Sequence, residues 1–124
     1  IINDSYNSNP DSVKMGLETL SVYKTKGTKH VVLSDMLELG KSSKLEHRSV
    51  GELVKKMKFR NLYAYGAESY NTFLSAKGLE NNFYFDTKED LAKILKVMVK
   101  RGDVIYVKGS RGMKMEDVID YFKS

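Results

Sequence analysis

The stretch VKGSRGMKMEDV, residues 107–118, holds the residues best suited to bind an anion. Gly109 and Gly112 permit left-handed or closely approached backbone, which exposes N–H groups at the start of a helix expected over 115–122. The dipole of that helix favours an anion at the same place, and Arg111 can clamp a carboxylate or a phosphate. The pattern predicts an anion cradle. The alternative is an ordinary glycine-rich turn between a strand and a helix.

The two common nucleotide-binding loops are missing from the chain, which contains neither G-x-x-x-x-G-K-[ST] nor G-x-G-x-x-G. An alternative hypothesis takes the Gly-Ser-Arg-Gly run at 109–112 as a KH-like G-x-x-G clamp on nucleic-acid phosphates. The scattered lysines and the alternation of strands with helices argue against that hypothesis.

Polar side chains also follow the apolar pair Ile1-Ile2, namely Asp4, Ser5, Asn7 and Asn9. Their carboxylate, hydroxyl and amide groups suit the hydroxyl groups of a sugar. The alternative is that they bond their own backbone in turns and caps, and this is the favoured interpretation of Asn9, which precedes Pro10.

Asp35 and Glu38 place two carboxylates on one loop. Two acids alone are weak evidence for acid–base catalysis or for Mg²⁺, and the favoured interpretation is that both are solvated turn residues. His47 falls on the inner side of its expected helix, where a hydrogen-bonded boundary residue is favoured over a catalytic one. His30 precedes a strand and carries less signal.

Local patterns predict the elements that position these groups. Apolar residues recur at helical spacing over 50–57, 91–98 and 115–122, with a shorter stripe over 13–20 and a fifth helix expected over 68–75. Asn9 before Pro10, and Thr87 with Asp90, are helix-start signals. Short β-rich runs lie between the helices, at 1–2, 31–33, 62–65, 83–85 and 104–107.

Strands that alternate with helices predict one α/β domain, a three-layer Rossmann-like fold with a mostly parallel sheet. In such a sheet ligands bind beyond the carboxyl ends of the strands. The polar loops after residues 2, 33 and 107 all begin there, so we expect them to form one binding edge.

Composition limits the class of protein. The 124 residues suffice for one core, and no apolar stretch approaches the length needed to cross a bilayer. Cysteine is absent, which excludes disulfides and thiolate metal sites and fits a cytoplasmic location. The net charge of +5 shows no concentrated basic block, so neither a nucleic-acid partner nor a membrane span is expected. The start at Ile1, without methionine, is expected of a fragment cut at a domain boundary.

Three segments in this order resemble the C-terminal domain of the Mur ligases: INDSYNSNPDSVKMGLETL, then LSDMLELG with EHRSVGE, then GDVIYVKGSRGMKMEDVI. The resemblance runs from Ile1 to about Tyr121. It implies that residues 1–124 are the closing domain of a three-domain ligase whose other domains bind a UDP-sugar and, through a P-loop and Mg²⁺ ligands, ATP.

The resemblance also implies an activity and partners. The expected ligase uses ATP and Mg²⁺ to form an acyl phosphate on UDP-N-acetylmuramoyl-tripeptide, and the amine of D-alanyl-D-alanine then attacks it to form an amide for peptidoglycan synthesis. A related ligase with another amino-acid acceptor is the alternative. The fragment alone is expected to be inactive, with no catalytic or metal-binding residue of its own and with the upstream domains as its partner.

By resemblance, Asp4 holds the nucleotide ribose, and Asn7 and Asn9 shape the loop near the nucleotide. The family's K-G-S-R segment falls on 108–111 and its D-M-x-E-L-G segment on 35–40. The resemblance assigns these two segments to the incoming dipeptide: Ser110 and Arg111 to its carboxylate, Lys108 to the same loop, and Asp35 or Glu38 to its amine or to loop order.

Two positions depart from the family pattern. Ser34 stands where glycine is expected, and Ser8 where alanine is usual between the two asparagines. Both side chains are small, so the expected fold is unchanged, but the local contacts at these two points are less secure.

Overall fold

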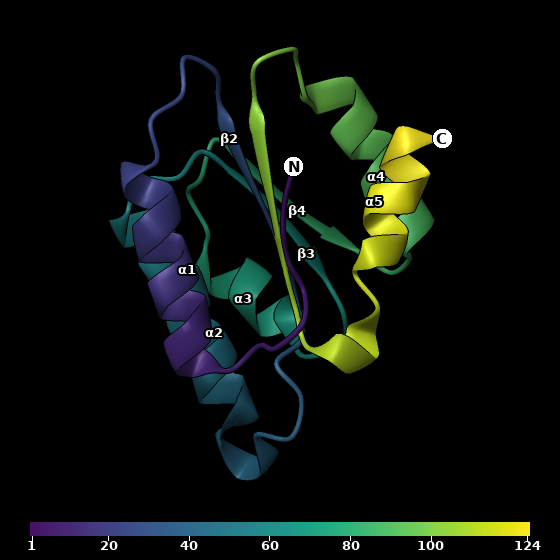
Figure 1. The fold of residues 1–124 in the computed structure, drawn as a ribbon. Helices are drawn as coiled ribbons and strands as arrows, with labels where there is room; N and C mark the ends of the chain where they lie inside the picture. Colours follow the sequence, from purple (N-terminus) through teal and green to yellow (C-terminus); the bar gives the residue numbers. More distant parts are fainter.

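Five parallel strands form one sheet in the order β1-β5-β2-β3-β4 in the computed structural model, which describes residues 1–124 (Figure 1). The strands are β1 Ile2–Asp4, β2 Lys29–Ser34, β3 Asn61–Tyr65, β4 Asn81–Phe85 and β5 Val104–Lys108. The helices are α1 Pro10–Val22, α2 Ser43–Lys56, α3 Ser69–Ser75, α4 Lys88–Met98 and α5 Glu116–Lys123. Short 3-10 helices, η1 Gly40–Ser42 and η2 Arg111–Met113, precede α2 and α5.

The helices cover both faces of the sheet, which confirms the predicted three-layer architecture. Figure 1 shows α1, α2 and α3 on one side and α4 and α5 on the other. Side chains alternate between the two faces along each strand. Val31 and Leu33 join the core beneath α1 and α2, while Val32 joins the core beneath α4 and α5. None of the helices is long and apolar enough to span a membrane.

The predicted helix-start signals act as caps. The Asn9 side chain accepts a hydrogen bond from the Ser12 N–H at 2.9 Å, and the Ser12 hydroxyl faces the Asn9 N–H at 3.0 Å. This reciprocal pair satisfies donors that the first turn of a helix otherwise leaves free. Thr87 caps α4 in the same way by accepting from the Asp90 N–H at 3.1 Å.

Each of the five strands extends beyond its predicted run. At the edge where the strands end, β1 continues to Asp4 and β5 continues to Lys108, and these two residues pair in register. The apolar pattern and the β propensities predict that each of these two strands ends at its last apolar residue. In the structure, the backbone pairing continues through the polar residues Asp4 and Lys108. Asp4 and Lys108 therefore lie side by side at the edge where the strands end.

A buried polar cluster ties together the opposite edge, where the strands begin. His30 is 2% exposed and bridges the Tyr63 hydroxyl at 2.8 Å and the Asp103 carboxylate at 2.9 Å. Burial alone would raise the pKa of the Asp103 carboxyl. Hydrogen bonds from the backbone N–H groups of Lys100 and Thr28, together with His30, lower this pKa to about 2.

Asp103→Ala should lower the free energy of unfolding by about 1 to 3 kcal/mol near neutral pH, because two backbone N–H groups lose their acceptor. The depressed pKa means that this stabilisation is present above the unfolded-state pKa of about 4 and is lost as the pH falls toward 2. Urea denaturation of both chains between pH 7 and pH 2 measures the difference. The difference in unfolding free energy should shrink below pH 4. A difference that persists unchanged at pH 2 would contradict the stabilising role of the Asp103 carboxylate. Asp86→Ala, at an exposed turn, is the control.

Candidate functional site

Because all five strands are parallel, the loops that follow β1, β2, β3 and β5 meet at one edge of the sheet. Ser110 joins three of these loops. Its backbone N–H donates to the Asp35 carbonyl at 3.1 Å. Its hydroxyl accepts from the Leu37 N–H at 2.8 Å and donates to the Ser8 carbonyl at 3.4 Å. Ser110 therefore holds together three loops of the predicted binding edge, although they come from distant parts of the chain.

Asp4 stands at the centre of a hydrogen-bonded cluster at the end of β1 and β5. The ammonium group of Lys108, a residue only 2% exposed, donates to Asp4 Oδ2 at 3.0 Å and to the Asn7 carbonyl at 2.8 Å. The Tyr106 hydroxyl donates to the same Asp4 oxygen at 2.6 Å. Both donors approach one oxygen, so Asp4 Oδ1 remains available to an outside donor.

Tyr106 stays protonated and keeps donating to Asp4. Burial, the hydrogen bond to Asp4 and the charge of that carboxylate all raise the pKa of the Tyr106 phenol above its ordinary value. Gly16 of α1 makes room for this hydroxyl, because a Cβ atom at Gly16 would lie 1.9 Å from the Tyr106 oxygen. Sequence reasoning missed both residues. The available signal was the glycine itself, which costs about 1 kcal/mol inside a helix unless close packing requires it.

A cleft of about 570 Å³ opens beside this cluster, between β1 and α1. Its walls include Asp4, Asn7, Gly16, Tyr106 and Lys108. This volume falls within the range of small-molecule sites. Apolar side chains with a few converging polar groups line it, which is the usual character of a site for an organic ligand. Asn9 also follows β1, but its side-chain oxygen caps α1, as the favoured interpretation predicted.

Asp35 is 5% exposed, so the prediction of a solvated turn residue is wrong for this carboxylate. It accepts from the Ser69 N–H at 2.7 Å and from the Glu68 N–H at 3.2 Å, at the start of α3. Gly66, with φ of 115°, passes so close that a Cβ atom would lie 2.4 Å from the carboxylate. Glu38 is exposed and has a left-handed φ of 64°.

His47 is buried and both of its ring nitrogens are engaged. Nε2 accepts from the Met36 N–H at 3.0 Å, and Nδ1 donates to the Ser43 carbonyl at 2.8 Å. The Ser43 hydroxyl in turn donates to the Glu68 carboxylate at 2.6 Å. This network holds the loop after β2 against α2, which confirms the predicted structural role of a hydrogen-bonded histidine.

The predicted anion cradle differs from expectation in its backbone. Neither Gly109 nor Gly112 has a positive φ; the left-handed residue is Lys114, with φ of 50°. Gly109 is required for close approach, because a Cβ atom there would lie 1.8 Å from the Ser34 hydroxyl. The 3-10 turn η2 separates β5 from α5, so the loop does not lead directly into α5 as predicted.

Exposed donors nevertheless gather on this loop. The backbone N–H groups of Arg111 and Gly112 donate to no acceptor within the chain. The Arg111 guanidinium lies over the Tyr6 ring, 5.1 Å from its centroid, and one of its nitrogens is 3.5 Å from the Tyr6 hydroxyl. A smaller hollow of about 270 Å³ adjoins Arg111, with Glu116 also in its lining. Two free amides and a guanidinium can bind a carboxylate or a phosphate.

The side chains bring together no group of three or more acids, histidines or cysteines fit for a metal ion.

Comparisons with known proteins found a matching family and similar enzymes. Residues 1–111 match the family described as "Mur ligase, glutamate ligase domain". The chain is 34% identical over 125 residues to the UDP-N-acetylmuramoyl-tripeptide–D-alanyl-D-alanine ligase of Bacillus subtilis, covering 96% of this chain and 27% of that relative. It is 32% identical over 121 residues to the enzyme of the same name from Escherichia coli, covering 96% and 26%.

Solved structures are similar as well. The MurF ligase of Thermotoga maritima in complex with ADP superposes with a TM-score of 0.81 at 30% identity, over 96% of this chain and 26% of that one. MurF from Acinetobacter baumannii gives 0.84 at 25% identity, over 97% and 27%. The chain thus spans about a quarter of the length of the curated relatives it matches.

The two serines that depart from the family pattern are both buried and both lack a hydrogen-bond partner at the hydroxyl. Ser8→Ala and Ser34→Ala should therefore each raise the free energy of unfolding, by about 1 kcal/mol, since a buried unpaired hydroxyl is costly. Ser110→Ala is the matched control. Its hydroxyl is the acceptor for the Leu37 N–H, so its loss should destabilise the chain. Urea denaturation measures the unfolding free energy of each variant. Equal destabilisation by all three variants would refute the distinction between unpaired and hydrogen-bonded serine hydroxyls.

Proposed function

Because the chain belongs to the Mur ligase family, we propose that it is the C-terminal domain of a longer ligase that adds D-alanyl-D-alanine to UDP-N-acetylmuramoyl-tripeptide. The observation that carries the proposal is the hydrogen-bonded cluster at Asp4. Curated relatives of the chain bear the name of that ligase, which supports the same proposal. The product of such a reaction is a peptidoglycan precursor, and we propose a cytoplasmic location for the enzyme.

The proposed reaction forms one amide bond at the expense of one phosphoanhydride. The terminal carboxylate of the tripeptide attacks the γ-phosphorus of ATP, which releases ADP and leaves an acyl phosphate. The free amine of the dipeptide then attacks the acyl carbon, and inorganic phosphate departs. No residue of this chain is proposed to be catalytic. Its role is to bind and orient the reactants beside the upstream domains.

Asp4 is proposed to hold the ribose of the nucleotide. The site fits this task, because Lys108 and Tyr106 fix one carboxylate oxygen while the other stays available to accept from ribose hydroxyls. Asn7 and Asn9 contribute by shaping the loop: the Asn7 carbonyl holds Lys108, and the Asn9 side chain starts α1. The volume of the adjoining cleft is consistent with part of a nucleotide.

The loop after β5 is proposed to bind the carboxylate of the dipeptide through Arg111 and the two free N–H groups. The polar atoms of Ser110 and Lys108 form hydrogen bonds within the chain, so these two residues are proposed to hold the loop in place. Asp35 is assigned to loop order rather than to the dipeptide amine, because it accepts from two backbone N–H groups. The exposed Glu38 is the acid that remains for the amine.

Magnesium is proposed to be bound by the upstream domains. The side chains of this chain gather no carboxylate cluster that fits a magnesium ion, so no step is assigned to Mg²⁺ here. When bound beside the phosphates of ATP, the ion would neutralise charge during phosphoryl transfer.

Dipeptide-dependent release of ADP tests the proposed function. The assay is run with the 124-residue chain alone, with the upstream domains alone, and with the two joined in one polypeptide. Only the joined protein should release ADP at a rate that depends on both the tripeptide substrate and D-alanyl-D-alanine. Turnover by the isolated chain, or an inactive but folded joined protein, would refute the proposal.

Two substitutions in the joined ligase should have opposite kinetic signatures. Arg111→Ala should raise the KM for the dipeptide by about 10- to 100-fold and leave the KM for ATP nearly unchanged, because a charge-assisted hydrogen bond is lost. Tyr106→Phe should raise the KM for ATP about fivefold and spare the dipeptide, because Asp4 loses one of its two orienting donors.

Tyr63→Phe is the matched control for Tyr106→Phe. It also removes a buried tyrosine hydroxyl, but at the opposite edge of the sheet, where the partner is His30. Loss of stability without a change in either KM is expected for this control. If Arg111→Ala raised the KM for ATP instead, the loop after β5 would be a phosphate site.

A further inference from the structure

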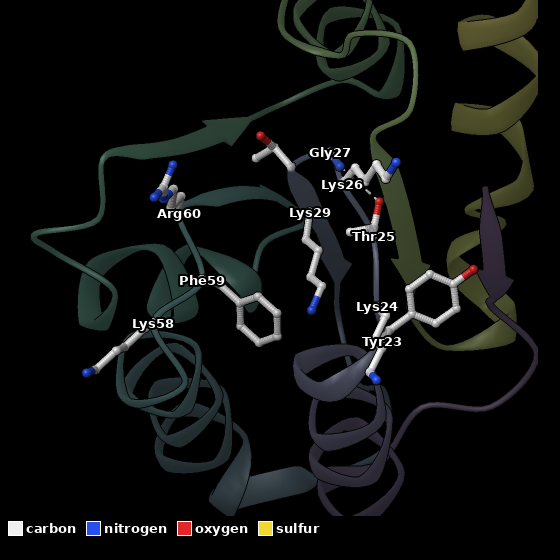
Figure 2. A pocket seen from close by; sticks show the side chains of 10 residues that line it. Tyr23, Lys24, Thr25, Lys26, Gly27, Lys29, Lys58, Phe59 and Arg60 are labelled. Atoms are coloured by element: carbon white, nitrogen blue, oxygen red, sulfur yellow. Dashed lines mark hydrogen bonds between the residues drawn. The ribbon is translucent and has the colours of Figure 1, made fainter.

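A basic cleft lies at the edge of the sheet where the strands begin, opposite the site described above (Figure 2). Its volume is about 510 Å³. The segment 23–29, between α1 and β2, forms one wall, and the segment 58–60, between α2 and β3, forms the other. Five of its ten lining residues are cationic and none is acidic: Lys24, Lys26, Lys29, Lys58 and Arg60.

These five cations account for the net charge of the whole chain. Of the 21 lysines and arginines, 16 lie elsewhere, and they equal the 16 aspartates and glutamates in number. The sequence predicts dispersed surface charge because the five are divided between two segments about 30 residues apart. The fold brings these segments together, so that prediction is wrong at this cleft.

None of the five cations has an ionic partner in the chain. The three salt bridges of the structure involve His30, Lys88 and Lys108, and none of the cleft residues. Lys29 donates to the Ser21 carbonyl at the end of α1 at 3.0 Å, and Figure 2 shows its amino group between Phe59 and Lys24. Cations are favoured near the carboxyl ends of helices, which accounts for Lys29. The same effect does not extend to Lys26 or Arg60, which lie beyond the last turns.

The cleft walls are held in place before any ligand arrives. The Thr25 hydroxyl donates to the Gly102 carbonyl and accepts from the Gly27 N–H, both at 3.1 Å. A Cβ atom at Gly27 would lie 2.4 Å from the Gly102 carbonyl oxygen, so only glycine permits this approach. A prearranged site loses less conformational freedom when it binds.

The opposite wall is fixed at the end of α2. Lys58 has a left-handed φ of 62°, at the position after a helix where glycine is usual. The Lys58 N–H bonds the Lys55 carbonyl at 2.9 Å, and the Phe59 N–H bonds the Val54 carbonyl at 3.2 Å. Phe59 is buried, which anchors this wall to the core.

From these observations we propose that the cleft binds a small molecule that carries a diphosphate group. Five cations without an ionic partner line one cleft, and their combined positive charge attracts a polyanion. The volume exceeds the needs of a single phosphate, and lysine and arginine are the side chains that bind phosphate oxygens. The cleft lies at the opposite edge from Asp4, so it is distinct from the nucleotide site of the proposed reaction.

Calorimetric titration of the 124-residue chain with inorganic pyrophosphate tests the proposal. Saturable binding with one molecule per chain is expected, and it should weaken as salt is added, since the site is exposed. Lys26→Gln with Arg60→Gln removes one cation from each wall and should weaken binding about tenfold or more. Lys14→Gln with Lys93→Gln removes the same charge from exposed positions of α1 and α4 and should leave binding unchanged.

A second arm distinguishes a free ligand from a lipid headgroup that offers the same phosphate chemistry. Vesicles of phosphatidylcholine with phosphatidylglycerol are sedimented with the chain, with and without pyrophosphate. The proposal expects pyrophosphate binding without sedimentation. Sedimentation that pyrophosphate reverses, and that the cleft variant abolishes, would overturn the small-molecule assignment in favour of a headgroup. Absence of pyrophosphate binding, or equal weakening by both double variants, would overturn the site itself.

Discussion

The buried ammonium group of Lys108 is the constraint on which the candidate site depends. A buried charge is tolerated only when it is paired and hydrogen-bonded, and Asp4 and the Asn7 carbonyl supply both conditions. Because Lys108 is on β5 and Asp4 on β1, the pair extends the ladder between these strands to their ends. It also fixes the course of the loop after β1 and leaves the other oxygen of Asp4 without a partner in the chain.

The two edges of the sheet differ in how many of their cations have an ionic partner within the chain. At the edge where the strands end, Lys108 is paired, Asp35 caps α3 and Ser110 joins three loops, so most polar groups are satisfied within the chain. Arg111 and its neighbouring amides are the donors that remain free there. At the other edge, the cations of the cleft lack ionic partners although their backbone is firmly held. Anion binding is therefore supported at both edges, but for different ligands.

The fold could be predicted from the sequence because each element carries a local signal. Apolar spacing and caps such as Asn9 placed the helices, and β-rich runs placed the strands to within a few residues. The motif resemblance pointed to Asp4, Lys108 and Arg111. It could not reveal what these residues touch, since such contacts join positions far apart in the sequence.

The missed features are all of this long-range kind. From the sequence, Asp35 is indistinguishable from a surface acid, because the α3 backbone that it binds is distant in the chain. Tyr106 is likewise indistinguishable from any other strand residue, because the signal is its packing against Gly16 of α1. The basic cleft is hidden for the same reason, because its two walls are separate in the chain and meet only in the fold.

A crystal structure of the longer ligase with ADP and D-alanyl-D-alanine bound would test the central claim most directly. The account predicts a ribose hydroxyl within about 2.6 to 3.2 Å of the free Asp4 oxygen, with Lys108 and Tyr106 still on the other oxygen. It also predicts the dipeptide carboxylate against Arg111. A nucleotide bound away from Asp4, or an Asp4 that turns from Lys108 when the nucleotide binds, would contradict the account.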